Sequence, residues 1–196
     1  MIYSLRAKNK LDANRTEVYL QDTWRYYRND SSTLYTLNYG VRFSHWNFNQ
    51  ESTLSPRVSL GITPSWNRDL TFRLATGLYY QAPFFKERDT STVNGMTVAS
   101  LNDKVKSQRA IHVIGGMDYR FKVNNRPYRF SAEAYYKFLH NLIPYSVSNV
   151  QVVYYGDHTA TGHAAGVDLK LYGEFVPGTD SWITLSFMNT KMNVDG

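Results

Sequence analysis

The sequence predicts an all-β fold, an antiparallel up-and-down transmembrane β-barrel, from three observations. Apolar and polar residues alternate along many segments of about ten residues, the period of a strand between two unlike surroundings. Short turns alternate with longer connections, as they do between the two sides of a membrane barrel. No run of about 18 apolar residues is present, which excludes a transmembrane helix and leaves barrel strands possible.

The clearest strand is 129–138. Its even positions are apolar or aromatic and its odd positions are mostly polar or charged. The outward residues are Phe130, Ala132, Ala134, Tyr136 and Phe138; the opposite ones are Arg129, Ser131, Glu133, Tyr135 and Lys137. The pattern returns in 165–175, where Ala165, Val167, Leu169, Leu171 and Phe175 alternate with Asp168, Lys170, Tyr172 and Glu174.

The other strands follow the same rule with varying clarity. The segment 2–7 is a short strand, and the register of 17–27 is unclear because either choice sends a polar residue to the apolar side. In 34–47 the apolar face holds Tyr35, Leu37, Tyr39, Val41 and Phe43, and in 54–64 it holds Val58, Leu60 and Ile62.

The later strands alternate more strongly. In 70–81 the apolar face holds Leu70, Phe72, Leu74, Leu78 and Tyr80, and in 109–122 it holds Ile111, Val113, Met117, Tyr119 and Phe121. The last strand, 181–190, presents Ile183, Leu185 and Phe187. We therefore expect about nine strands.

The connections differ between the two ends of this meander. Tight polar turns are expected at 29–32, 66–69, 124–127 and 177–180, and long loops at 83–106 and 141–160. Outer-membrane barrels show this asymmetry, with short periplasmic turns and long extracellular loops.

Aromatic residues gather at both ends of the strands, as the two interfacial bands of a barrel do. Those near the turns are Trp24, Trp66, Tyr128, Phe130, Phe175 and Trp182, and those near the loops are Phe43, Trp46, Tyr80, Phe84, Phe85, Tyr136 and Phe138.

Charge and cysteine content exclude some classes of site and leave the compartment open. The 196 residues carry a formal net charge of +6, which suits a cationic lumen or loops better than nucleic-acid binding, because no block of basic residues is present. Cysteine is absent, so disulfides and zinc–thiolate sites are excluded. No signal peptide is apparent in Met1–Arg6, which reads as a strand.

Four segments resemble the barrel of TonB-dependent outer-membrane receptors, in the form found in Bacteroidetes. They are Val18–Trp24, Ser55–Leu60, Gly77–Glu87, and Tyr154–Gly156 followed by Gly162–Asp168. The resemblance covers most of the chain from about residue 16 onward. It implies a barrel of about 22 strands around a plug domain, with energy supplied through TonB.

That resemblance also sets the expected function and partners. We expect the chain to be a partial barrel domain, residues 1–196, of a receptor in the outer membrane of a Gram-negative bacterium, with the plug and the final strands absent. The partners implied are outer-membrane lipid, the plug and remaining strands, TonB, and an imported metal chelate, oligosaccharide or peptide. The alternatives are a small self-contained barrel with a structural or adhesive role and a soluble all-β binding domain.

Candidate ligand-binding residues are aromatic and amide side chains at the two long loops, which suit amphipathic or sugar-like ligands. They are Tyr79, Gln81, Phe84, Phe85, Tyr145, Tyr154 and Tyr155; the alternative role for them is membrane-interface or loop packing. No metal site is expected, although Asp157, His158 and His163 share one loop.

Catalysis is not expected either. Four carboxylates face the predicted lumen, where ion pairs with basic neighbours explain them better than acid–base chemistry. The carboxylates are Asp118, Glu133, Asp168 and Glu174, and the expected partners are Arg73, Arg120, Lys137 and Lys170. No phosphate-binding loop, nucleophile elbow or catalytic triad pattern is present, so neither an enzyme nor a cofactor is expected.

Overall fold

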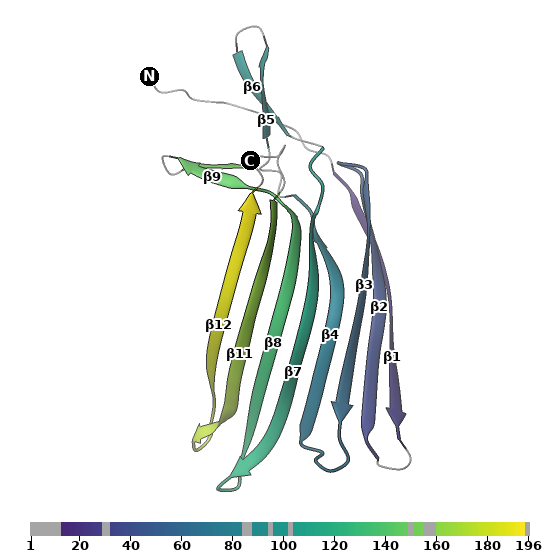
Figure 1. Cartoon of the computed structure of the whole chain (residues 1–196), viewed down its shortest axis with the longest axis vertical. Helices are drawn as coiled ribbons and strands as arrows, with labels where there is room; N and C mark the ends of the chain where they lie inside the picture. The colour runs from purple at the N-terminus through teal and green to yellow at the C-terminus, as the bar shows by residue number, and fades with distance from the viewer. Residues whose placement is uncertain are drawn as a thin grey trace.

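The computed structural model describes residues 13–28, 32–83, 88–93, 96–101, 104–148, 151–154 and 160–194. Eight long strands form one antiparallel sheet, and each is hydrogen-bonded to its neighbours in chain order (Figure 1). They are β1 (Arg15–Tyr27), β2 (Leu34–Trp46), β3 (Glu51–Thr63), β4 (Leu70–Gln81), β7 (Gln108–Val123), β8 (Arg126–Leu142), β11 (Ala160–Val176) and β12 (Thr179–Val194). The described residues contain no helix that could span a membrane.

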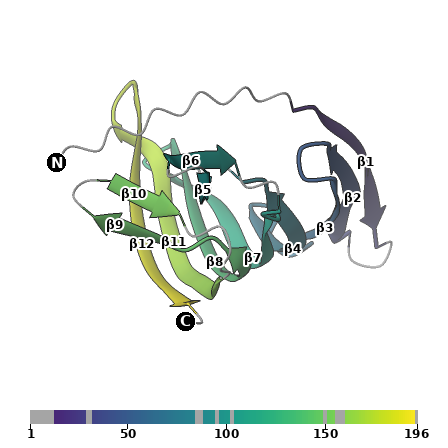
Figure 2. The same cartoon turned by 90° about the horizontal axis from the view of Figure 1, so that it is seen from above.

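All eight strands that the alternation predicts beyond residue 12 are confirmed. The ninth prediction, a strand at 2–7, lies outside the described residues. Seen from above, the sheet curves into an open arc in which β1 and β12 are the two ends (Figure 2). Within the described residues, neither edge strand is paired on its outer side.

The two faces of the sheet have opposite chemistry. Directly opposed residues share a face, and one apolar row crosses all eight strands: Trp24, Leu37, Leu60, Leu74, Gly115, Ala134, Val167 and Phe187. Most of these side chains are well exposed. Few apolar side chains of the described residues are buried: Trp46, Val105, Ala160 and Ala164, with Pro64, Pro83 and Pro144. Exposed apolar surface on this scale is unfavourable in water and fits contact with lipid.

The pairing settles the register of β1. Val18, Leu20, Trp24 and Tyr26 share the apolar face of their β2 partners, which leaves Asp22 on the same face. Its carboxylate accepts a hydrogen bond of 3.0 Å from the hydroxyl of Tyr39, the residue directly opposite. The polar residue on the apolar side therefore has a cross-strand partner.

The short connections lie at one end of the sheet (Figure 1). Asn124 and Asn125 both have positive φ, 50° and 65°, which is the type I′ turn that suits the twist of a two-residue hairpin. Pro177 and Gly178 join β11 to β12, and Gly178 has φ 77°, the value that the third position of a type II turn requires.

The other end carries the two long connections, as predicted, together with the four-residue turn between β2 and β3, residues 47–50, which is shorter than expected. Each long connection contains a short hairpin that the sequence did not predict. The first contains the hairpin β5 (Arg88–Val93) and β6 (Met96–Leu101), and the second contains β9 (Tyr145–Ser148) and β10 (Gln151–Tyr154). Apolar and polar residues do not alternate in Arg88–Val93 or in Gln151–Tyr154, so a period of two could not reveal these hairpins.

The sheet opens between β3 and β4 toward this end. Ladder pairing joins only Arg57–Ile62 to Phe72–Gly77, although β3 stays paired with β2 along its whole length. Pro56 lies at the point where pairing with β4 stops, and proline has no N–H to donate. The segment before β7 instead bonds to the start of β3: Glu51 accepts hydrogen bonds from the backbone N–H of Ser107, at 2.9 Å, and from its hydroxyl, at 2.5 Å.

Aromatic side chains on the apolar face gather toward both ends, as predicted. Near the short turns Phe121 stacks on Tyr128 with ring centroids 5.6 Å apart, and near the long connections Tyr136 packs on Phe138 at 4.5 Å. Two residues assigned to these bands lie elsewhere. Trp182 shares the polar face with its partner Tyr172, and Trp46 is buried beside Phe48.

Candidate functional site

The polar face of the sheet holds the candidate site, because it is hollowed and carries most of the charged side chains. One of its cross-strand rows is Gln21, Gly40, Arg57, Gly77, His112, Lys137, Ala164 and Thr190. Cationic groups outnumber carboxylates on the described part of the eight strands' polar face. The cationic residues include Arg15, Arg25, Arg42, Arg57, Arg73, Arg120, Lys122, Arg129, Lys137 and Lys170, and the carboxylates include Glu17, Glu51, Asp118, Glu133 and Asp168.

Gly77 is the centre of a three-strand cluster on this face. Arg57 of β3 and His112 of β7 are its direct cross-strand partners, and Tyr79 lies two residues further along β4. A Cβ at Gly77 would be 3.0 Å from Cγ of Arg57 and 3.1 Å from Cε2 of Tyr79, so the glycine leaves room for the tyrosine ring. The guanidinium carbon of Arg57 is 4.4 Å from the centre of that ring, and the His112 ring stacks on it at 4.3 Å. Tyr79 is thus held between an arginine and a histidine.

Beside this cluster is a hollow of about 560 Å³, within the usual size range for small-ligand sites. Hydrogen-bonding side chains from β1 to β4 line much of it, among them Tyr19, Gln21, Asn38, Arg42, Ser55, Arg57, Ser59 and Tyr79. Some of these groups are already ordered: the amide nitrogen of Asn38 donates to the hydroxyl of Ser59 at 3.2 Å, and its amide oxygen accepts from the hydroxyl of Thr23 at 2.8 Å. This hollow can present several fixed donors and acceptors to a polar ligand.

Asp118 is the one buried carboxylate on the described part of the polar face. One of its oxygens accepts from Nε and Nη2 of Arg129, at 3.1 and 2.9 Å, and the other lies 3.1 Å from Nη2 of Arg73. Arg73 also reaches the hydroxyl of Ser131 at 3.4 Å. Both oxygens are occupied, so Asp118 serves to join β4, β7 and β8 rather than to move a proton.

The expected ion-pair partners are therefore correct for Arg73 and wrong for three other residues. Arg120, Lys137 and Lys170 form no salt bridge within the described residues, and Arg129, which was not among the expected partners, pairs with Asp118. Lys137 and Lys170 lie over the rings of Tyr135 and Tyr172 instead, at 4.9 and 4.4 Å. Glu174 accepts a hydrogen bond from the N–H of Gly178 and so closes the β11–β12 turn.

Comparison with protein families decides what kind of sheet this is. The family described as TonB dependent receptor-like, beta-barrel matches residues 2–195, almost the entire chain. The chain belongs to this family. Comparison with curated proteins and with solved structures gives no match.

Membership explains the two faces. TonB-dependent receptors are transport proteins of the outer membrane of Gram-negative bacteria and not enzymes. In such a barrel the apolar face meets lipid and the polar face lines the lumen. The hollow beside Tyr79 lies on the polar face.

The described residues bring together two of the predicted ligand-binding residues. Tyr79 and Gln81 lie two residues apart on the polar face of β4, and Tyr145, 57% exposed, begins β9 in the other long connection. Tyr154 ends β10, whose backbone alone is described. Phe84, Phe85 and Tyr155 lie outside the described residues.

Arg57 and His112 are the members of the cluster that sequence reasoning missed. Each lies on a different strand from Tyr79, and only the register across β3, β4 and β7 places both against it.

The histidine candidates for a metal site do not come together in the described part of the chain. His163 lies on the apolar face, where its ring stacks on Tyr136 with centroids 5.6 Å apart. Asp157 and His158 lie outside the described residues. Within the residues that the structure describes, no group of three or more potential metal ligands is present.

Proposed function

We propose that this chain forms part of the barrel wall of a receptor that imports a nutrient across the outer membrane of a Gram-negative bacterium. The observation that carries the proposal is the sharp division between an exposed apolar face and a hollowed polar face over eight antiparallel strands. Family membership supports the same role.

The free edges support a wall that continues beyond these strands. β1 and β12 each leave a row of backbone N–H and C=O groups unpaired in the described residues, and lipid cannot satisfy them. We propose that further strands pair with both edges. The other partners in this proposal are outer-membrane lipid, a plug domain in the lumen, and TonB acting through that plug.

The ligand is proposed to contact the lumen hollow next to Arg57 and Tyr79. The Tyr79 ring already contacts the Arg57 guanidinium and stacks on the His112 ring, so its part in this proposal is to orient Arg57 rather than to stack on the ligand. Arg57 and the neighbouring amide and hydroxyl groups then offer hydrogen bonds. This lining suits a hydroxyl- or carboxylate-rich nutrient such as an oligosaccharide, a peptide or a metal chelate.

Uptake by whole cells tests the proposal. Cells that lack the full-length receptor, and cells restored with it, are given labelled ferric chelates, oligosaccharides and oligopeptides. We expect uptake of one class to require the receptor and to stop when a protonophore removes the inner-membrane proton gradient. Arg57→Gln should reduce that uptake, whereas Arg25→Gln, which removes the same charge on the same face away from the hollow, should not. Equal uptake of every class with and without the receptor would refute an import function.

Dependence on detergent separates this proposal from the soluble all-β alternative. The exposed apolar face predicts that the purified receptor stays monodisperse only in detergent or lipid. Stable dispersal in plain buffer would favour the soluble alternative.

A further inference from the structure

A group of basic side chains lies on the apolar face, at the end of the sheet that carries the long connections. Arg109 of β7 and His140 of β8 are direct cross-strand partners, and one row closer to the middle of the sheet His163 of β11 is the partner of Lys191 of β12. All four have the parity of the apolar row on their strands. We call these four residues the basic rim.

The basic rim lies at the depth expected for lipid headgroups. On the same strands the aromatic pair Phe121 and Tyr128 lies three residues from the turn at 124–125, about 8 Å along the axis for a rise of about 3.4 Å per residue and a tilt of about 40°. An apolar band about 25 Å tall that starts there ends about 33 Å from the turns. The rim residues lie 13 to 15 residues beyond the turns at 124–125 and 177–178, which is about 34–39 Å on the same scale.

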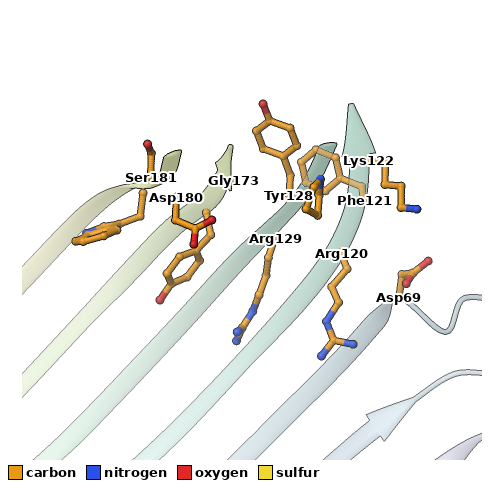
Figure 3. Close-up of a pocket in the computed structure, with 12 residues that line it drawn as sticks. Asp69, Arg120, Phe121, Lys122, Tyr128, Arg129, Gly173, Asp180 and Ser181 are labelled. Carbon is orange, nitrogen blue, oxygen red and sulfur yellow. The ribbon is translucent and has the colours of Figure 1, made fainter. Parts of the chain in front are cut away.

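The opposite interface differs on the same strands. Figure 3 shows Arg120 and Arg129 pointing to one side of β7 and β8 and Tyr128 to the other, so the arginines near the short turns lie on the polar face. On the apolar face there, Phe121 stacks on Tyr128. In the described part of β7, β8, β11 and β12, Arg126 beside the turn is the one basic residue on the apolar face at that end. The basic rim therefore distinguishes one leaflet of the membrane from the other.

The charge of the rim is not offset within the described residues. Neither Arg109 nor Lys191 forms a salt bridge there. The Nε atom of Arg109 is buried and has no hydrogen-bond partner in the same part of the chain, an arrangement that costs free energy. An anion from outside the sheet would compensate both basic groups.

Apolar surface adjoins the rim on the side toward the middle of the sheet. Ile111 and Phe138, 37% and 44% exposed, follow Arg109 and His140 along their strands. The ring of Tyr136 packs on Phe138 at 4.5 Å and stacks on His163 at 5.6 Å, so the imidazole is held at the edge of this apolar surface. A ligand here meets basic groups at one end and apolar side chains at the other, which suits a lipid better than a free anion.

We propose that the basic rim binds the phosphate of an anionic membrane lipid in the leaflet next to the long connections. The guanidinium of Arg109 and the ammonium of Lys191 hold the phosphate oxygens, and the two imidazoles add N–H donors. The acyl chains lie along Ile111 and Phe138. The inference rests on the proposed function in that the apolar face must meet lipid, and it requires no transport.

Native mass spectrometry of the purified full-length receptor in an uncharged detergent tests the site. The receptor is titrated with phosphatidic acid, with phosphatidylcholine of the same acyl chains, and with phosphatidic acid in the presence of excess inorganic phosphate. We expect phosphatidic acid to bind most tightly, and its affinity to fall about fivefold in Arg109→Gln and in Lys191→Gln. Lys137→Gln is the matched control, because it removes the same charge from β8 on the opposite face, and it should leave the affinity unchanged.

Circular dichroism and resistance to unfolding by heat in detergent identify any variant that fails to fold. A receptor that requires detergent but binds phosphatidic acid no more tightly than phosphatidylcholine would overturn this inference and leave the proposed function standing. Equal weakening in Arg109→Gln and Lys137→Gln, or full competition by inorganic phosphate, would also overturn it. Preference for phosphatidic acid in a receptor without uptake activity would overturn the import function and support the lipid site.

Discussion

Replacing Leu74 with arginine tests which face of the sheet meets lipid. Leu74 is 58% exposed and belongs to the apolar row that crosses all eight strands. It lies four residues beyond Leu70, where β4 begins, which corresponds to about 10 Å along the axis of a barrel whose strands tilt by about 40°. That depth is near the middle of an apolar band about 25 Å tall.

Arginine at this depth should cost about 2–4 kcal/mol of folding free energy, equivalent to about a 30- to 900-fold fall in the folding equilibrium. The matched control is Ala75→Arg, the same new side chain one residue further on, where it enters the hollow of the polar face. Denaturant titration of the full-length receptor refolded into lipid measures both variants. Equal destabilisation at the two positions would refute the assignment of the faces.

Three further predictions concern individual contacts. Gly173→Ala would place a Cβ against Cδ1 of Tyr128 and should lower the free energy of unfolding by about 1–3 kcal/mol in the same titration. Gly115→Ala is the control, because no atom lies within 4 Å of its added Cβ, and it should stay within about 1 kcal/mol of the wild type. Equal losses in the two variants would contradict this packing. Asp118→Asn leaves two half-exposed guanidinium groups without their carboxylate and should lower unfolding free energy by about 1–2 kcal/mol; an unchanged denaturation midpoint would show that the ion pairs contribute nothing. Glu51→Gln weakens the hydrogen bonds that Glu51 accepts from Ser107, so trypsin should cleave the segment before β7 faster. An unchanged cleavage rate would mean that these hydrogen bonds do not hold the segment in place.

The sequence was sufficient for the strands and for most of their faces. A period of two over ten residues places each side chain on one of two faces, so Leu74, Val113 and Val167 could be assigned without any knowledge of the pairing. The faces of strand 17–27 could not be assigned from the sequence, because Asp22 interrupts its apolar face. Only the pairing with β2 shows that the carboxylate of Asp22 accepts a hydrogen bond from the opposing Tyr39.

Contacts between strands were the part that could not be predicted. The partner of Asp118 depends on register: Arg120 is near in sequence, but Arg129 on β8 points its guanidinium back toward the carboxylate. The arrangement of Arg57 and His112 around Tyr79 likewise needs the register of three strands. Trp182 was assigned to an aromatic band because it lies near a turn. Its neighbour Ile183 lies on the apolar face, so the alternation of the strand places Trp182 on the polar face.

The central claim is that adjacent residues of one strand face lipid and water in turn, and spin labelling along β4 tests it most directly. The 196 residues contain no cysteine, so single cysteines can be introduced throughout this strand. In lipid vesicles, labels on the apolar face should relax faster with oxygen, which concentrates in lipid, and labels on the polar face should relax faster with a water-soluble nickel complex. The labels expected in lipid are at Leu70, Phe72, Leu74, Thr76 and Leu78, and those expected in the lumen are at Thr71, Arg73, Ala75 and Tyr79. Alternation in this phase is the result predicted; uniform accessibility, or alternation in the opposite phase, would contradict the account.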